Sequence, residues 1–365
     1  MALSSFPVEA AATRFRVEQF IQPLRERDIE IELSPFLDGA GFKQLYSKSG
    51  SANKAANVFR AVAARTAKTF RSRRYDLLFI QRESMPFGPG IFEWLYRTMG
   101  RLPIVLDLDD ATYVPYESPT YGKLGSYLKF FGKTNRLIDR AELVVCGNRF
   151  IAAHVESRGT PSIIIPTIVD TDVFAPAART NEIPILGWIG THSTFPFLEQ
   201  IFPILRRLAR KYEFKVKVVG SGRSKVSIEG AEVENLEWKL EREVADFQSL
   251  DIGLYPISVS PSANDDWLAG KSGFKAVQYM SVGVPSVISP VGVCAEIGKA
   301  GQTHLNATTD EDWYNDLEKL LSEPESRQGI GKNARAYALE HFSLNDHDDL
   351  FAKRPIGKGR YRVNG

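Results

Sequence analysis

The segment 269–290, AGKSGFKAVQYMSVGVPSVISP, places two lysines where a helix is expected to begin. A helix N-terminus carries partial positive charge and free N–H groups, so lysines at this end oppose the helix dipole. The arrangement becomes favourable if an anion docks there, because a hydrogen bond to a charged group contributes about 1.5–3 kcal/mol. Ser272 is the expected N-cap and Gly273 the first helical residue. The segment therefore predicts an anion site at Lys271 and Lys275.

Two other loops follow strand-like runs and have the composition of phosphate-binding turns. In GWIGTHSTF, residues 187–195, a strand ends in glycine, a hydroxyl-rich loop follows, and Pro196 stands where a helix should start. Backbone N–H groups and hydroxyls in such a turn can surround an anion. A plain turn with Ser193 or Thr194 as helix cap is the alternative. In VVGSGRSK, residues 218–225, two glycines after a strand indicate either close backbone approach to a ligand or a tight turn.

A third group is LDLDD, residues 106–110. Asp107 and Asp109 form a D-x-D pattern, and carboxylate oxygens at this spacing can hold a metal ion. Asp109 could instead cap a helix beginning in ATYVPY.

Strand-like runs alternate with helical patterns through both halves of the chain, which predicts βαβ units and mostly parallel sheets. Pro203 should kink the helix of residues 195–212. The simplest architecture is α/β, with two doubly wound, Rossmann-like domains facing a central cleft and ligands at the carboxyl ends of the strands. We expect domains at 1–165 and 181–342, a linker at 166–180 and a C-terminal return segment with a basic tail at 343–365. Strands are predicted at 29–33, 75–81, 102–108, 141–146, 162–166, 184–190, 214–220, 251–257, 285–289 and 303–307.

The composition is that of an ordinary soluble protein, with 43% hydrophobic and 25% charged residues in a chain of 365. No apolar run approaches the roughly 18 residues that span a bilayer, and no signal peptide is visible. The two cysteines, Cys146 and Cys294, are far apart, so each is expected to be a buried, reduced thiol in a cytoplasmic protein. Two cysteines and five histidines make a zinc site improbable.

The net charge is +2, and the basic excess gathers in segment 57–74. Its cations would flank an apolar face formed by Val58, Val62 and Phe70. A solvated helix on a parallel sheet is one interpretation, and peripheral contact with an anionic membrane or a lipid phosphate is the other. No recognised nucleic-acid motif occurs, and the charge is near neutral, so nucleic acid is not an expected partner. The cations are Arg60, Arg65, Lys68, Arg71, Arg73 and Arg74.

GWIGTHST, LDIGLYPI and DDWLAGKSGFKAVQYMSVGVPSVISPVGV, in this order, resemble the C-terminal half of a GT-B glycosyltransferase of the retaining family four, also called group 1. RFRVEQFIQPLRERDIEIELSPF, YDLLFIQRE, PIVLDLDDATY, CGN and PTIVDTDVF resemble its acceptor domain and linker, so the resemblance covers roughly residues 12 to 342. It implies transfer of a sugar from a UDP- or GDP-sugar to a hydroxyl of a surface glycan or lipid-linked precursor. It also implies retention of configuration, with no metal and no cofactor.

The resemblance further implies which residues bind the donor. The family's two glutamates, eight positions apart, correspond here to Gly270 and Gln278, and Gln278 could hydrogen-bond a ribose hydroxyl. The family's Arg and Lys after the first strand of this half are missing from THST, and we expect Lys271, with Lys275, to replace them. Trp238 is expected to stack on the base, with a buried core Trp as the alternative. The implied donor site is Gly190, Thr191, His192, Ser193, Gly220, Ser221, Trp238, Lys271, Ser272, Gly273, Phe274, Lys275 and Gln278.

On the acceptor side, Asp109 falls where many relatives carry a histidine near the reacting sugar, and Asp110 lies beside it. Either carboxylate could bind a sugar hydroxyl or stabilise positive charge at the anomeric carbon, so both are predicted to be catalytic. Acceptor contacts are expected from Arg14, Arg16 and Glu83, although Glu83 could instead pair with Arg82.

Two other functions stay open, because the family's glutamate pair is replaced. The chain could be a catalytically weak nucleotide-sugar-binding protein or a partner subunit of an active transferase. It could also be a GT-B enzyme of other chemistry, such as a nucleotide-sugar epimerase.

Overall fold

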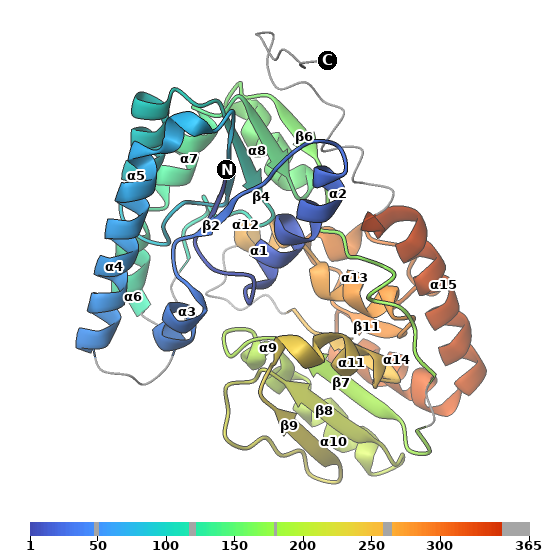
Figure 1. Cartoon of the computed structure of the whole chain (residues 1–365). Coiled ribbons are helices and arrows are strands. Elements are labelled where there is room, and N and C mark those ends of the chain that lie inside the picture. Colours follow the sequence, from blue (N-terminus) through green and yellow to red (C-terminus); the bar gives the residue numbers. More distant parts are fainter. Residues whose placement is uncertain (47–50, 117–121, 179–180, 258–264, 345–365) are drawn as a thin grey trace. The chain divides into compact units, whose positions relative to one another are not determined.

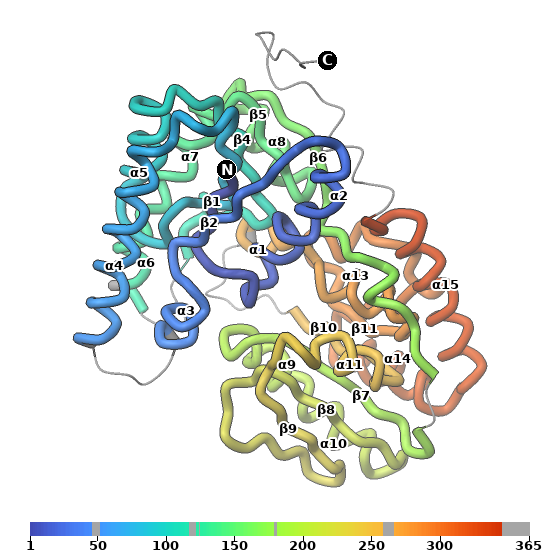
Figure 2. Tube along the Cα trace, in the orientation of Figure 1, coloured from blue at the N-terminus to red at the C-terminus, as the bar shows by residue number. Residues whose placement is uncertain are grey.

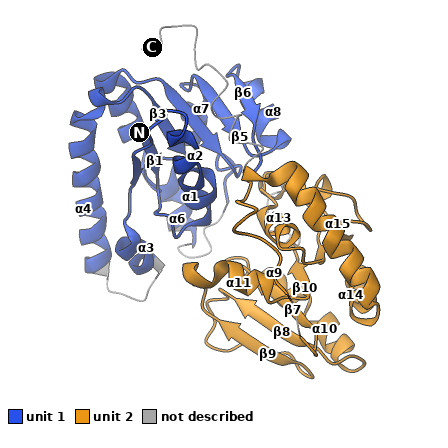
Figure 3. Ribbon diagram, turned by 45° about the vertical axis from the view of Figure 1, so that its right-hand side comes forward, with its two compact units in different colours: residues 1–167, 347–365 blue, residues 168–346 orange. Residues whose placement is uncertain are grey.

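The computed structural model describes residues 1–46, 51–116, 122–178, 181–257 and 265–344. The chain divides after Thr167 into two compact units, unit 1 and unit 2 (Figure 3), and the division falls inside the predicted linker. Each unit contains one six-stranded sheet in which every pairing is parallel. The predicted α/β class with two doubly wound sheets is therefore confirmed. The predicted tail lies outside the described residues beyond Leu344.

The sheet of unit 1 has the order β2-β1-β3-β4-β5-β6 (Figure 1). The chain therefore leaves β1 in one direction and returns to its other side at β3, and in such sheets ligands bind where the direction changes. The predicted strand at 29–33 is wrong, because Asp28 turns the chain with a φ of 60° and pairing begins only at Leu33. The strands are β1 (Ala2–Ser4), β2 (Leu33–Pro35), β3 (Leu78–Gln81), β4 (Ile104–Leu108), β5 (Leu143–Cys146) and β6 (Ser162–Ile164).

Two helical stretches of unit 1 are interrupted. Residues 122–138 form two helices, because Phe130 adopts a φ of 53°, which ends the first helix. Residues 11–25 are likewise divided by a 3₁₀ turn. The helices are α1 (Ala11–Arg16), α2 (Ile21–Arg25), α3 (Gly39–Tyr46), α4 (Ser51–Phe70), α5 (Ile91–Leu95, continued by a π turn at Tyr96–Gly100), α6 (Gly122–Lys129), α7 (Gly132–Ile138) and α8 (Arg149–Ser157).

The sheet of unit 2 has the order β12-β11-β10-β7-β8-β9, and the chain runs outward from the central strand β7 before returning beside it at β10 (Figure 2). The switch point lies between β7 and β10. The sequence analysis missed β9, an edge strand whose glutamates alternate with half-buried residues. The strands are β7 (Ile185–Ile189), β8 (Lys215–Val219), β9 (Glu232–Leu236), β10 (Ile252–Tyr255), β11 (Ser286–Ile288) and β12 (Leu305–Asn306).

The core of unit 2 is formed by the central strands and the helices packed on them, with Leu186, Leu198 and Leu205 fully buried. The predicted kink at Pro203 is confirmed as a break at Ile201. Pro203 lies in the first turn of the second helix, where its missing N–H removes no helical hydrogen bond. The helices are α9 (Phe195–Gln200), α10 (Phe202–Ala209), α11 (Glu243–Gln248), α12 (Asp265–Ala269), α13 (Phe274–Ser281), α14 (Asp310–Ser322) and α15 (Pro324–Phe342).

The thiols match the prediction, since Cys146 and Cys294 are free and buried, and burial raises the pKa of each to about 12. Within the described part of the chain, no helix combines the length and apolar character needed to cross a bilayer.

Half of the cations of segment 57–74 hold α4 and its end against the sheet. Arg65 is buried and donates to the carbonyls of Ser4 and Ser34, at 3.3 and 2.9 Å. Lys68 and Arg74 both pair with Glu32, at 3.5 and 2.6 Å. Phe70 does not belong to a packed apolar face as predicted, because 69% of it is exposed.

Candidate functional site

The two glycine-bearing loops of unit 2 lie against each other at the carboxyl ends of β7 and β8. Gly220 has a φ of +83°, and a Cβ there would lie only 2.3 Å from the carbonyl oxygen of Gly190. Gly222 has a φ of +68°, and its Cβ would lie 2.7 Å from Cβ of His192. Only glycine fits this close approach of backbones without strain. The loops that the sequence suggested separately therefore form one surface.

The first of these loops presents hydroxyl groups. The hydroxyls of Thr191 and Ser193 are 2.8 Å apart, and Thr191 and His192 are exposed. Thr194 holds the N-cap position of α9, but its hydroxyl accepts from the N–H of Thr191 at 3.1 Å and makes no cap bond to the helix. The hydrogen bonds of these hydroxyls are thus formed within the loop, and the hydroxyls lie at the edge of the sheet.

The second loop is fastened to β9 and lies beside Trp238. Ser221 is buried, and its hydroxyl donates to Oδ1 of Asn235 at 2.8 Å and accepts from the N–H of Arg223 at 3.1 Å. Trp238 is half-buried, and its Cβ lies 3.5 Å from the position of a Cβ on Gly220. The alternative of a buried core Trp is therefore wrong. Its predicted stacking on a base stays a prediction.

The helix with the lysines, α13, begins one residue later than predicted. Gly273 is the N-cap, in the left-handed region with a φ of +63°, and it makes no side-chain cap bond. The prediction of Ser272 as N-cap is wrong. A Cβ on Gly273 would lie 3.2 Å from Sγ of Cys294 and 3.3 Å from Val293, so this tight packing and the positive φ both favour glycine.

Tyr279 anchors α13 to the switch point. Its hydroxyl lies 3.1 Å from the carbonyl oxygen of Gly187 in β7 and 3.2 Å from that of Leu254 in β10. Burial raises the pKa of this phenol, which keeps the proton that it donates. Its ring covers Gly253, where a Cβ would lie 2.7 Å from ring atoms. Because α13 lies in the connection between the parallel strands β10 and β11, its start lies toward the carboxyl end of the sheet, the edge where the loops after β7 and β8 also lie.

The two lysines at this end have different surroundings. Nζ of Lys271 lies 3.6 Å from the centre of the Trp267 ring, a cation–π contact. Nζ of Lys275 donates to Oε1 of Gln278 at 2.9 Å and lies 5.2 Å from the centre of the Phe247 ring. Gln278 is fully buried, and its amide nitrogen has no hydrogen-bond partner among the described residues. A buried donor without a partner is rare in folded proteins, so this nitrogen is a candidate ligand contact.

Sequence reasoning missed two residues of this edge. Arg223 is exposed, and its guanidinium carbon lies 5.6 Å from the centre of the Phe195 ring, at the start of α9. It places a second positive charge, besides Lys271, at this edge of the sheet, and the signal for it was the arginine that follows G-S-G. Trp267 forms the cation–π contact with Lys271, and the only feature of the sequence that indicated it was its position four residues before that lysine.

In unit 1, Asp109 is held by Arg82 at the carboxyl ends of β3 and β4. Nε and Nη2 of Arg82 lie 2.5 and 2.6 Å from the two oxygens of Asp109, and Nη2 also lies 2.6 Å from Asp110. Gln81 donates to Asp109 at 3.1 Å. Arg82 has a φ of 60°, unusual for a residue with a side chain, so this cluster is built on a strained backbone.

Both sequence-based alternatives for this group are wrong. Asp109 does not cap a helix in ATYVPY, because residues 111–116 form turns. Glu83 pairs with Lys133 at 2.8 Å, and Arg82 pairs with the aspartates instead. Burial would raise the pKa of Asp109, but the Arg82 guanidinium outweighs it and holds that pKa below its ordinary value. Asp109 is thus ionised at neutral pH and suited to accept hydrogen bonds or to stabilise positive charge.

Asp107, the other member of the D-x-D pattern, is bound within the fold. It is buried in β4 and forms an ion pair with Arg16, whose Nε lies 3.1 Å from both carboxylate oxygens. Arg16 also donates to the carbonyls of Ile165 and Pro166, at 2.8 and 2.9 Å. Arg16 is buried with these partners, so its geometry supports a structural role rather than the predicted acceptor contact. In the ranges that the structure describes, no group of three or more His, Cys, Asp or Glu side chains could hold a metal ion.

The other two predicted acceptor residues are also engaged within unit 1. Nη1 of Arg14 donates to the carbonyl of Val8 at 2.6 Å, and its guanidinium lies over the Phe15 ring. Glu83 is buried with Lys133. Acceptor binding by Arg14 and Glu83 stays a prediction.

Comparison with known proteins gives one family and one fold. Residues 197–337 match the family model described as glycosyl transferases group 1. No curated protein matches the chain in sequence. The match covers most of unit 2, including α13, and confirms the resemblance of that part of the chain to group 1.

The fold is similar to those of three solved structures. Anabaena Alr3699/HepE in complex with UDP-glucose is 16% identical, with a TM-score of 0.66, over 97% of this chain and 98% of that one. Sucrose-phosphate synthase from Thermosynechococcus elongatus is 12% identical, with a TM-score of 0.66 and the same coverage. A glycosyltransferase from Rickettsia africae ESF-5 is 15% identical, with a TM-score of 0.66, over 98% and 99%. The GT-B fold is therefore confirmed.

Proposed function

We propose that the chain is a cytoplasmic glycosyltransferase. It would move a sugar from a UDP- or GDP-sugar to a hydroxyl of a surface glycan or lipid-linked precursor, with retention and without metal. The observation that carries the proposal is the meeting of three groups at the switch edge of unit 2, namely the hydroxyl loop after β7, the glycine loop after β8 and the start of α13. The group 1 match over the same unit supports it, as does the UDP-glucose complex of the similar Anabaena protein.

In this proposal, different side chains at this edge of the sheet bind different parts of the donor. Thr191 and Ser193 bring hydroxyls and Lys271 brings positive charge to the diphosphate. Trp238 provides a flat surface for the base. The amide nitrogen of Gln278, which has no hydrogen-bond partner among the described residues, would donate a hydrogen bond to the ribose.

The reaction needs no side-chain nucleophile. The acceptor oxygen forms a bond to the anomeric carbon on the face from which the diphosphate leaves, and the acceptor proton passes to a diphosphate oxygen. The main task of the protein is to stabilise charge on the departing diphosphate, because fixed donors and cations contribute most where charge develops. Asp109 and Asp110 would bind a sugar hydroxyl or stabilise the positive charge of the sugar.

A binding protein without turnover is the second candidate, and one feature favours it. Gly270 offers no side chain where the family has a glutamate, and the amide of Gln278 replaces the other carboxylate. Such a protein would bind the donor and leave it unchanged. A nucleotide-sugar epimerase would convert the donor without any acceptor.

The test is a calorimetric titration with UDP, GDP and their sugars, followed by incubation of the bound donor with and without lipid-linked and glycan acceptors. We expect binding of one nucleoside diphosphate, slow donor hydrolysis alone, and faster release of diphosphate with an acceptor in excess EDTA. A requirement for Mn²⁺ or Mg²⁺ would refute metal independence. Tight binding with no turnover in any mixture would favour the binding protein, and failure of every nucleotide to bind would refute the proposal.

A further inference from the structure

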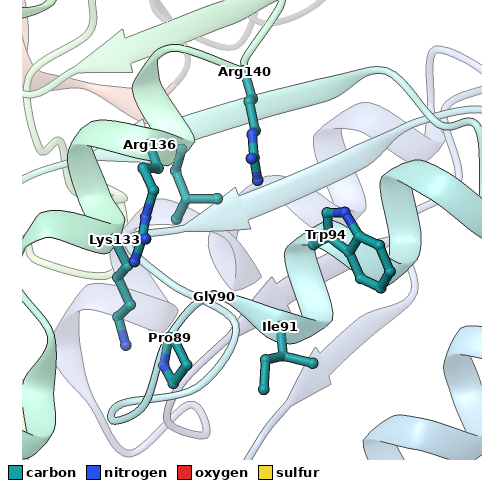
Figure 4. A pocket seen from close by; sticks show the side chains of 8 residues that line it. Pro89, Gly90, Ile91, Trp94, Lys133, Arg136 and Arg140 are labelled. Carbon is teal, nitrogen blue, oxygen red and sulfur yellow. The ribbon is translucent and has the colours of Figure 1, made fainter.

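A basic and aromatic pocket lies between α5 and α7 of unit 1. It has a volume of about 170 Å³. Figure 4 shows Arg136 of α7, Arg140 from the turn that follows α7, and Ile91 and Trp94 projecting from α5. None of the eight lining residues is acidic; they are Pro89, Gly90, Ile91, Trp94, Lys133, Arg136, Leu137 and Arg140.

Large apolar side chains are exposed in this pocket and at the neighbouring end of α6. The N–H of Gly88 donates to the carbonyl of Leu128 at 2.8 Å, so the end of α6 lies beside the segment that leads into α5. The exposed apolar side chains at the end of α6 therefore lie near those of α5. Exposed apolar side chains that gather in one place usually mark an interaction site. Their exposed fractions lie between 39% and 76%, and the residues are Ile91, Trp94, Tyr127, Leu128 and Phe130. We call these five residues, with Arg136 and Arg140, the α5–α7 face.

The charges of the two arginines in this pocket are not neutralised by ion pairs among the described residues. Arg136 lies in α7 and Arg140 lies in the turn that follows it; both are exposed, and in the described part of the chain neither side chain forms a hydrogen bond or an ion pair. Lys133, on the same helix, differs because it is buried against Glu83 and donates to the carbonyl of Met85 at 2.8 Å. An anion beside this pocket would be attracted by both guanidiniums.

We infer that the α5–α7 face docks on the surface of an anionic phospholipid bilayer. Arg136 and Arg140 would contact lipid phosphates, while Trp94 and Tyr127 would lie at the headgroup level, where aromatic side chains with a polar end are favoured. Charge complementarity selects this occupant, since a pocket without carboxylates beside exposed apolar residues matches the anionic and apolar layers of such a surface. The contact differs from the one predicted for segment 57–74, where Arg65, Lys68 and Arg74 are engaged within the protein.

The test is co-sedimentation of the full chain with vesicles of phosphatidylcholine alone and with phosphatidylglycerol added, with no nucleotide present. Its failure is therefore distinct from a failure of the proposed transferase activity. We expect binding only to the anionic vesicles. Arg136→Gln with Arg140→Gln should weaken it about 25-fold, because each basic residue near an anionic surface contributes about fivefold. Trp94→Ser should weaken it about tenfold.

Matched controls separate this face from general charge and from α4. Arg206→Gln with Arg210→Gln removes two exposed arginines at the same spacing on α10 and should leave vesicle binding unchanged. Phe59→Ser alters the exposed side of α4 and should also leave it unchanged. Circular dichroism and melting curves show whether each variant is folded.

Four results would overturn the inference. The first is equal binding by the α5–α7 variants and the wild type. The second is loss of binding only on changing α4, which would return the contact to segment 57–74. The third is a dimer in light scattering that Trp94→Ser converts to a monomer while vesicles are not bound, which would identify a second copy of the chain as the occupant. Strong competition by soluble glycerol phosphate would assign the pocket to a free phosphate and also refute bilayer docking.

Discussion

Replacing Lys271 by alanine should weaken nucleoside diphosphate binding and leave the fold of unit 2 intact. The lysine contacts the Trp267 ring at 3.6 Å, a kind of contact that contributes about 0.5–1 kcal/mol at an exposed site. Removing a cation beside the N-terminus of α13 should raise the free energy of unfolding by a similar amount, about 0.3–1 kcal/mol, because the cation opposes the helix dipole. The melting temperature without ligand should therefore change by no more than about 4 °C.

The loss should appear in binding instead. A hydrogen bond from an ammonium to a phosphate contributes about 1.5–3 kcal/mol, so the affinity for UDP or GDP should fall about ten- to a hundredfold or somewhat more. The affinity for the nucleoside alone should barely change, because it carries no phosphate. Calorimetric titration of both variant and wild type with diphosphate and nucleoside measures the difference.

Lys275 provides the matched control, since the structure gives it a different role. Its Nζ donates to Oε1 of the buried Gln278 at 2.9 Å. Lys275→Ala would leave that oxygen without this donor, and an unsatisfied buried polar group costs about 1–3 kcal/mol. We expect this variant to melt several degrees lower even without ligand. Full affinity in Lys271→Ala, with an unchanged melting temperature and lost binding in Lys275→Ala, would mean that Lys275 is the phosphate contact. No loss in either variant would mean that no phosphate docks at α13.

Three other predictions concern the remaining groups. Asp109→Asn should lower turnover strongly and leave nucleoside diphosphate affinity nearly intact, and unchanged turnover would exclude a sugar contact. The same residue should make stability depend on acid: because the pKa of Asp109 is lowered in the fold, its contribution is present above about pH 4 and is lost as the pH falls through that lowered pKa. The wild type should therefore have the larger free energy of unfolding in urea at pH 6, and its difference from Asp109→Asn should decrease as the pH is lowered to 3. Gly220→Ala should destabilise unit 2 by more than about 1 kcal/mol and weaken nucleotide binding, because its Cβ would strike the carbonyl of Gly190. Wild-type melting of that variant would show that the two loops separate easily.

Much of the fold could be predicted because alternation of short apolar runs with amphipathic segments is a local signal. Nine of the ten predicted strands, for example those at 102–108 and 184–190, contain observed strands, while the strand at 29–33 was misplaced because a single left-handed residue, Asp28, delays the pairing. The edge strand β9 was missed because its alternate residues are glutamates. Residues that pack only on one neighbouring strand carry a weaker apolar pattern than central ones.

The candidate donor site was predicted as three separate segments, and tertiary structure supplied what joins them. Nothing local in the sequence states that Gly220 touches Gly190 or that Gly222 touches His192. The helix start was misjudged because serine is the commoner N-cap, and the deciding factor was the close approach of Val293 and Cys294, which lie about twenty residues further along the chain. Local propensity was overridden by packing at this position.

The D-x-D pattern shows why spacing alone does not assign chemistry. Asp107 and Asp109 are two residues apart, and each carboxylate meets an arginine, yet their surroundings differ because β4 ends at Leu108. Asp107 lies inside the strand and shares a fully buried ion pair with Arg16, so both charges are used in holding β4 against α1 and the end of β6. Asp109 lies beyond the strand and pairs with an arginine that remains partly exposed and also reaches Asp110. The Asp109 side chain is only 5% exposed, but its partners Arg82 and Asp110 are 29% and 26% exposed, so a ligand can reach this cluster without opening the core. This makes Asp109 rather than Asp107 the residue to substitute in a test of catalysis.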